Sequence, residues 1–178
     1  MAASGHSQLG RQPEHMAIED LGPAERFAAG ALGPPGSRRF FVEVTASGVV
    51  HSFPCEKTQV AELAEQGLRM LTAAAIEIDE QAVENLVATG LEIGEPDAPS
   101  FRIGSIGVAI ERSEFITVVL GSSEGEDEVR FVITAEQFRA MALVAARVVA
   151  AGRPLCPRCQ LPMDPEGHRC PSSNGHHI

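Results

Sequence analysis

Residues 26–55 read RFAAGALGPPGSRRFFVEVTASGVVHSFPC, and this stretch decides the fold class. Three short apolar runs, 26–32, 39–45 and 49–55, are separated by two groups of Gly, Pro and Ser residues. Short apolar runs between such turn residues are typical of antiparallel strands. The stretch therefore predicts a three-stranded antiparallel meander.

A helix is expected directly after the meander, because apolar residues from Val60 to Leu71 recur at helical spacing while charged residues occupy the other face. Asp79 is expected to cap a shorter helix, which Gly90 ends as the residue after its last turn. Residues 92–100 contain one glycine and two prolines, so we expect them to form a linker.

The second half of the chain repeats this order. Residues 27–33 (FAAGALG) and 101–107 (FRIGSIG) share the pattern F-x-x-G-x-[LI]-G. Strands are predicted over 101–112, 114–121 and 129–134, followed by a helix that opens with a capping box of Thr134 and Gln137. The sequence thus predicts an α+β fold of two similar βββα halves, about 25–75 and 100–151, forming antiparallel sheets with helices packed on one face.

Three regions are expected along the chain. Residues 1–23 carry scattered polar residues without periodicity, which is typical of a disordered leader. The duplicated domain is expected to span residues 24–152. A tail of residues 153–178 remains, and it is too short to bury a core of its own.

Composition limits the classes of function. The 178 residues contain 24 acidic and 14 basic side chains, and the resulting net charge of −10 repels nucleic acid and anionic membranes. No apolar stretch reaches the ~18 residues of a membrane-spanning helix. The first 22 residues lack the apolar segment of a signal peptide. Three of the four cysteines lie within fifteen residues, as in metal sites rather than secreted disulfide frameworks, so we expect a cytoplasmic protein.

The tail carries a predicted metal clip. Cys156 and Cys159 form a C-x2-C pair, and His168 and Cys170 follow after eight residues. Two cysteines at this spacing can bind one tetrahedral ion, and three Cys with one His would close its coordination, which is typical of structural zinc. A redox C-x-x-C pair and idle thiols are the alternatives. If His168 were not a ligand, His176 or His177 would be available.

A second candidate site depends on the repeated glycines. Glycines in strands usually mark bulges or close backbone contacts. The alternative is a ligand groove lined by backbone at the junction of the two halves, where strand arginines would receive a phosphate or a carboxylate. The residues of this predicted groove are Gly30, Gly33, Gly104, Gly107, Arg38 and Arg102. His51, Cys55 and the acidic turn 124–128 are interpreted as a packed strand residue, a buried thiol and a solvated hairpin tip.

Two motifs support a resemblance to a known family. Residues 27–41 match FxxGxxGxPGxRxFF, and residues 156–175 match CPxCxxPxxPxGHxCPxxNG. From about Met16 onward the chain resembles an uncharacterised actinobacterial family, catalogued as a domain of unknown function. Its members look to be encoded beside a histidine-phosphatase-like protein and a protein similar to phosphoinositide 3/4-kinases, which implies a shared pathway or complex and makes these two proteins candidate partners. Gln160 stands where the resemblance leads us to expect Gly.

These observations rank three functions without deciding whether the chain is an enzyme. We expect first a non-enzymatic binding or scaffold module with a structural zinc site. The alternative is an enzyme or a binder of a small anionic, phosphorylated ligand at the groove between the halves. Nucleic-acid binding through the tail comes last, because the body is acidic and the chain lacks Tyr and Trp for base stacking. The sequence contains no Walker loop, G-x-S-x-G elbow or H-E-x-x-H pair.

Overall fold

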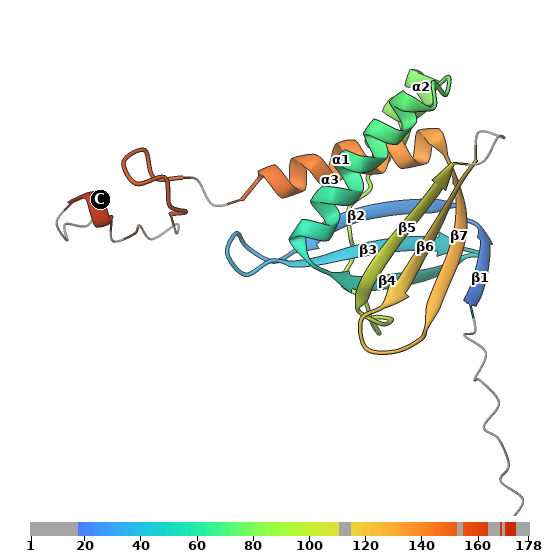
Figure 1. The fold of residues 1–178 in the computed structure, drawn as a ribbon, viewed down its shortest axis with the longest axis horizontal. Helices are drawn as coiled ribbons and strands as arrows, with labels where there is room; N and C mark the ends of the chain where they lie inside the picture. The colour runs from blue at the N-terminus through green and yellow to red at the C-terminus, as the bar shows by residue number, and fades with distance from the viewer. Residues whose placement is uncertain (1–17, 111–114, 153–154, 164–167, 169, 174–178) are drawn as a thin grey trace, which may run out of the picture.

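The computed structural model describes residues 18–110, 115–152, 155–163, 168 and 170–173, and within them the fold is mixed α+β with two sheets (Figure 1). The strands are β1 (Ile18–Pro23), β2 (Arg26–Leu32), β3 (Arg39–Ala46), β4 (Val49–Cys55), β5 (Ile103–Ile110), β6 (Phe115–Ser122) and β7 (Glu128–Thr134). The helices are α1 (Lys57–Ala73), α2 (Glu80–Ala88), α3 (Ala135–Ala150) and the short 3-10 turn η1 (Pro171–Ser173).

The first meander is confirmed as the sheet β2-β3-β4, in which both strand pairs are antiparallel. Val42 in the central strand lies opposite Ala29 on one side and Phe53 on the other. The turn between β3 and β4 places both Ser47 and Gly48 at positive φ (51° and 74°), as a two-residue hairpin turn requires.

The second sheet has the order β1-β7-β6-β5. Strands β5, β6 and β7 form the second predicted meander, with antiparallel pairing throughout. The first of these strands begins at Ile103 rather than Phe101, whose ring packs against Phe53 with ring centroids 5.0 Å apart. Three strands followed by a helix thus occur twice along the chain, while an origin of the halves by duplication stays a prediction.

Strand β1 corrects the predicted leader. Residues 18–23, assigned from the sequence to a disordered leader over 1–23, pair in parallel with β7, and residues 1–17 lie outside the described residues. Asp20 accepts hydrogen bonds from Arg130 and from the Gly22 N–H, and these hold the pKa of its carboxyl below the ordinary value. This strand could not be recognised from the sequence, because four of its six residues are acidic, Gly or Pro and have low strand propensity. Its pairing with β7 stabilises the extended conformation instead.

The caps predicted for the second and third helices are confirmed, and the first helix has a capping box as well. Glu56 and Gln59 form a capping box at α1, and Thr134 and Gln137 form another at α3. The Asp79 carboxylate accepts hydrogen bonds from two N–H groups in the first turn of α2. Gly90 follows Thr89, the C-cap residue of this helix, and has a φ of +84°. Within the described residues, none of the helices combines the length and apolar character needed to cross a bilayer.

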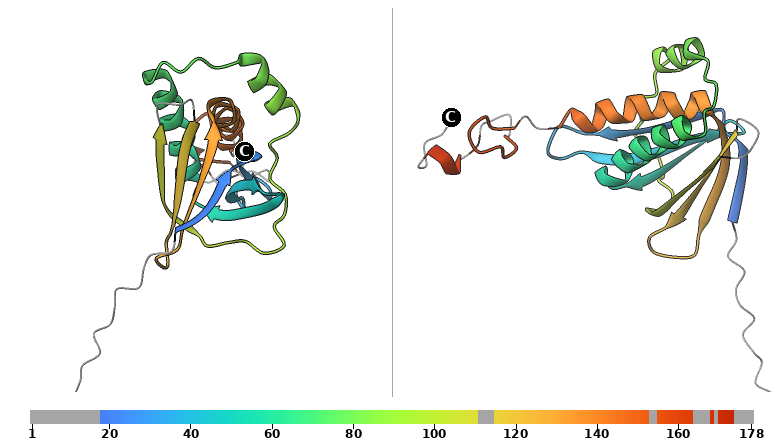
Figure 2. Two further views of the ribbon diagram at one scale, coloured as in Figure 1. Left: turned by 90° about the vertical axis from the view of Figure 1, so that its right-hand side faces the viewer. Right: turned by 45° about the horizontal axis from the view of Figure 1, so that its top comes forward.

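The core is centred on Phe138 of α3, which is fully buried. The Phe138 ring stacks on Phe27 of β2 at 6.0 Å, and Phe27 contacts Phe131 of β7 at 5.3 Å between ring centroids. A Cβ atom at Gly67 of α1 would lie 1.6 Å from Phe138 Cε1, so the ring occupies the space that a side chain would need. The two long helices therefore meet at this ring, and Phe27 connects it to Phe131 of the other sheet. Figure 2 shows these two helices packed beside each other over the sheets.

We expect Gly67→Ala to lower the free energy of unfolding by roughly 1–3 kcal/mol, because the buried Phe138 ring has no free space to move into. Chemical denaturation measures this change. Gly94→Ala is the matched control, since a Cβ atom there meets no heavy atom within 4 Å. Equal stability of the two variants would contradict the packing described above.

Candidate metal centre

Four side chains of the tail converge on one point. The ligand atoms of Cys156, Cys159, His168 and Cys170 all lie within 4.8 Å of one another. The Sγ atoms of Cys156 and Cys170 are 3.8 Å apart, and Cys159 Sγ lies 3.8 Å from His168 Nε2. Zinc bonds of ~2.3 Å to sulfur and ~2.0 Å to nitrogen in a tetrahedron separate the ligand atoms by roughly 3.5–3.8 Å. The set is thus compatible with one zinc ion.

The first ligand pair sits on a tight turn of the backbone. The Gln160 N–H donates to the Cys156 carbonyl at 2.9 Å, and the Cys156 N–H donates to the Leu161 carbonyl at 2.8 Å. Gln160 has a φ of +59°, a left-handed conformation that Gly adopts without strain. This explains why the resemblance leads us to expect Gly at this position. The turn brings both sulfur atoms to the same side of the chain.

The same turn favours the thiolate form of Cys156. Backbone N–H groups of Cys159 and Arg158 point at the Cys156 sulfur and lower its pKa to about 6. Burial has the opposite effect on Cys159 and raises the pKa of its thiol, and the neighbouring Cys156 and Cys170 add to this increase. A divalent cation would stabilise these thiolates, and it would thereby offset the free-energy cost of burying the sulfurs and of placing them close together.

His168 and Cys170 complete the set from the C-terminal part of the tail. Cys170 is 1% exposed and directly precedes η1. The alternative ligands His176 and His177 lie outside the described residues. Cys55, the remaining cysteine, is buried at the end of β4, and burial raises its pKa to about 12. It is a packed thiol and not part of the metal set, as the sequence suggested.

The first two predicted groove glycines have separate local roles. Gly30 lies beneath Ile93, whose Cγ1 would be 2.7 Å from a Cβ atom at that position. Ile93 belongs to the connection between α2 and β5, which runs round the outside of the β2-β3-β4 sheet (Figure 2). Gly33 has a φ of +94° in the β2–β3 turn.

The other four predicted groove residues also have separate local contacts. Gly104 lies at a bulge against the Ser123 backbone, whereas a Cβ atom at Gly107 would make only ordinary contacts. Arg102 is paired with Glu56 at 2.8 Å. Arg38 donates to the Val148 carbonyl at 3.0 Å, at the end of α3. The structure therefore distributes the six residues over several places instead of gathering them in one groove.

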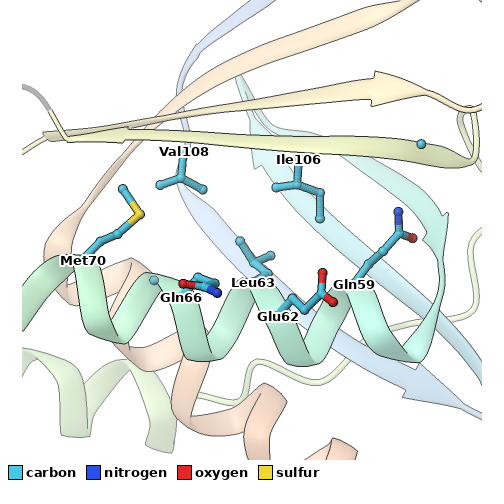
Figure 3. A pocket seen from close by; sticks show the side chains of 9 residues that line it. Gln59, Glu62, Leu63, Gln66, Met70, Ile106 and Val108 are labelled. Atoms are coloured by element: carbon cyan, nitrogen blue, oxygen red, sulfur yellow. The ribbon is translucent and has the colours of Figure 1, made fainter.

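A different groove does lie between elements of the two halves. It runs between α1 and the edge strand β5 and has a volume of about 290 Å³ (Figure 3). Of the six predicted groove residues, Gly104 alone lines it. Sequence reasoning missed it because the contact joins residues about forty positions apart. Its lining consists of Gln59, Glu62, Leu63, Gln66, Gly67, Met70, Gly104, Ile106 and Val108.

The comparisons with known proteins identify the family. The family described as Protein of unknown function (DUF3090) matches residues 20–170, and the chain belongs to it. The match includes all four predicted metal ligands. Searches of the curated proteins and of the solved structures found no match.

We expect the purified chain to contain one zinc per molecule, and Cys159→Ser and Cys170→Ser each to lower this content strongly, because each removes one of four ligands. Elemental analysis of dialysed protein measures it. Cys55→Ala removes a thiol outside the cluster and should keep one zinc. Full zinc content in both ligand variants would contradict the assignment.

Proposed function

We propose that this chain is a non-enzymatic protein-binding or scaffold module in which zinc holds the C-terminal clip, residues 155–173, in place. The observation that carries the proposal is the composition of the ligand set. Three thiolates and one imidazole fill the four positions of a tetrahedral zinc site, which leaves none for a substrate or water. This is the pattern of structural rather than catalytic zinc.

The burial pattern of the clip supports a structural ion. Its most buried side chains are Cys156 and Cys170, while Leu155 and Leu161 are 57% and 48% exposed. A segment that buries its ligands and exposes its leucines gains little from the hydrophobic effect. Zinc binding of ~10 kcal/mol or more, as in zinc-finger peptides, would supply the missing stability.

A reducing cytoplasm is the compartment we propose, because none of the four cysteines forms a disulfide. For the partner we propose a protein, and the resemblance implies either the histidine-phosphatase-like or the phosphoinositide-kinase-like protein. The net charge of −10 argues against nucleic acid in its place.

We expect calorimetric titration of the zinc-loaded chain with these two purified proteins to reveal a stable complex with at least one of them. The same titration of each protein with bovine albumin, another acidic protein, is the control for nonspecific association. Absence of binding to both proteins would contradict the partner proposal.

One observation favours the alternative of an anionic ligand. Arg38 and Lys57 line the same cavity of about 340 Å³, between the β2–β3 turn, the start of α1 and the clip. Two cationic groups in one cavity of an acidic chain favour a phosphate or a carboxylate. For the alternative function we therefore place the anion-binding site at this cavity instead of at the groove predicted from the sequence.

If this cavity binds phosphate, millimolar phosphate should raise the melting temperature of the chain, since a ligand of the folded state stabilises it. Arg38→Gln together with Lys57→Gln should abolish the shift, whereas Arg69→Gln together with Arg139→Gln, distant in sequence and outside this cavity, should keep it. A thermal shift that is absent, or equal in both double variants, would exclude the alternative at this cavity.

A further inference from the structure

The outer edge of β5 differs from the outer edges of β1 and β4 in the described part of the chain. At the opposite edge of the same sheet, β1 carries Glu19, Asp20 and Pro23. The outer edge of β4 contains Pro54 and is covered where the Ser100 N–H donates to the Ser52 carbonyl at 2.8 Å. Strand β5 reads IGSIGVAI, without a charge or a proline. Charges, prolines and covering segments are the usual means of preventing strand addition. Strand β5 carries no charge or proline, and among the described residues the side-chain contact to its main chain is at its start, where the Gln59 amide of α1 donates to the Ile103 carbonyl at 3.2 Å.

The apolar side chains of β5 are also incompletely covered. On the inner face of the sheet, Ile116, Val118 and Leu120 of β6 are at most 1% exposed. Their partners Ile110, Val108 and Ile106 on β5 are only half-buried. Figure 3 shows Ile106 and Val108 pointing from β5 towards α1, across the groove described above. The groove thus combines an unpaired strand edge with an apolar floor.

The helix supplies the opposite wall of this groove. Leu63 and Met70 extend the apolar floor, and Gln59 and Gln66 add amides. Glu62, which is exposed, is the charged residue among the lining residues. A ligand therefore meets unpaired main-chain groups, an apolar surface and one carboxylate.

We propose that this groove binds an extended peptide segment of a protein partner, which adds as a strand to the β5 edge. The inference rests on the proposed binding function and names its site. The N–H and C=O groups of an edge strand repeat at the spacing of another extended chain, and such a chain is the ligand that can pair with them in series. Alternate side chains of the segment would enter the groove and be apolar, and a Lys or Arg would face Glu62.

A second copy of this chain fits the groove less well. Antiparallel pairing of two β5 strands would satisfy both edges, but residues 103–110 contain no basic side chain to meet Glu62. A basic, alternating segment of another protein provides both the strand and the charge. Self-association through β5 is therefore an outcome that the test must be able to detect.

The test begins with selection of random nonapeptides displayed on phage against the full zinc-loaded chain. We expect the selected peptides to alternate apolar residues and to contain Lys or Arg. The strongest one, made synthetically, is then N-methylated at alternate residues in either register. Because only one register donates to β5, one methylated peptide should lose at least tenfold in affinity and the other less than twofold.

Two charge variants test the position of the site. Glu62→Lys should weaken peptide binding about fivefold or more by replacing attraction with repulsion. Glu65→Lys changes the net charge equally on the same helix but lies outside the groove, so it should change the affinity less than twofold. Analytical ultracentrifugation of the free chain should return a monomer.

The proposal is overturned if no peptide is selected, or if methylation in both registers has the same effect on affinity. It is also overturned if the two charge variants weaken binding equally. A dimer of the free chain that Ala109→Lys on β5 dissociates would overturn it as well. A partner protein that still binds the Glu62→Lys chain with unchanged affinity would also overturn this site. The proposed binding function would survive that result, so the two failures can be told apart.

Discussion

The contact between Phe138 and the backbone of α1 at Gly67 is the constraint on which the body of this protein depends. Through Phe27 and Phe131 the same ring reaches one strand from each sheet. The absence of a side chain at Gly67 lets α1 and α3 pack closely at this point. The close packing fixes α1 beside β5, and the open groove between helix and strand follows from that placement.

The clip depends on a different interaction. Its leucines are exposed, and its buried side chains are those of Cys156 and Cys170, which converge with Cys159 and His168. The body is therefore stabilised by apolar packing, whereas we propose that an ion stabilises the clip. These separate sources of stability explain how one chain can join an ordinary α+β body to a short segment with almost no regular secondary structure.

Local patterns in the sequence predicted much of the fold and of the metal set. The turn residues predicted the two meanders, and Asp79 and Thr134 predicted where two helices begin. Such signals can be read from the sequence because they depend on only a few neighbouring residues. The candidate ligands followed from the C-x2-C pair and from the H-x-C pair eight residues later. Three features were missed: strand β1, the α2–β5 connection that packs on the β2-β3-β4 sheet, and the groove beside β5. Each of them joins segments that lie far apart in the chain. The interpretation of the shared glycines as sites of bulges or close contacts is confirmed at two positions: Ile93 approaches Gly30, and Gly104 lies at a bulge against Ser123.

The central claim is that one zinc ion closes the clip with ligands from this chain alone. X-ray absorption at the zinc edge of the full-length protein tests it most directly. The account predicts three sulfur neighbours at ~2.3 Å and one imidazole nitrogen at ~2.0–2.1 Å. A zinc environment with an oxygen ligand in place of one of these four, or fewer than three sulfurs, would contradict it.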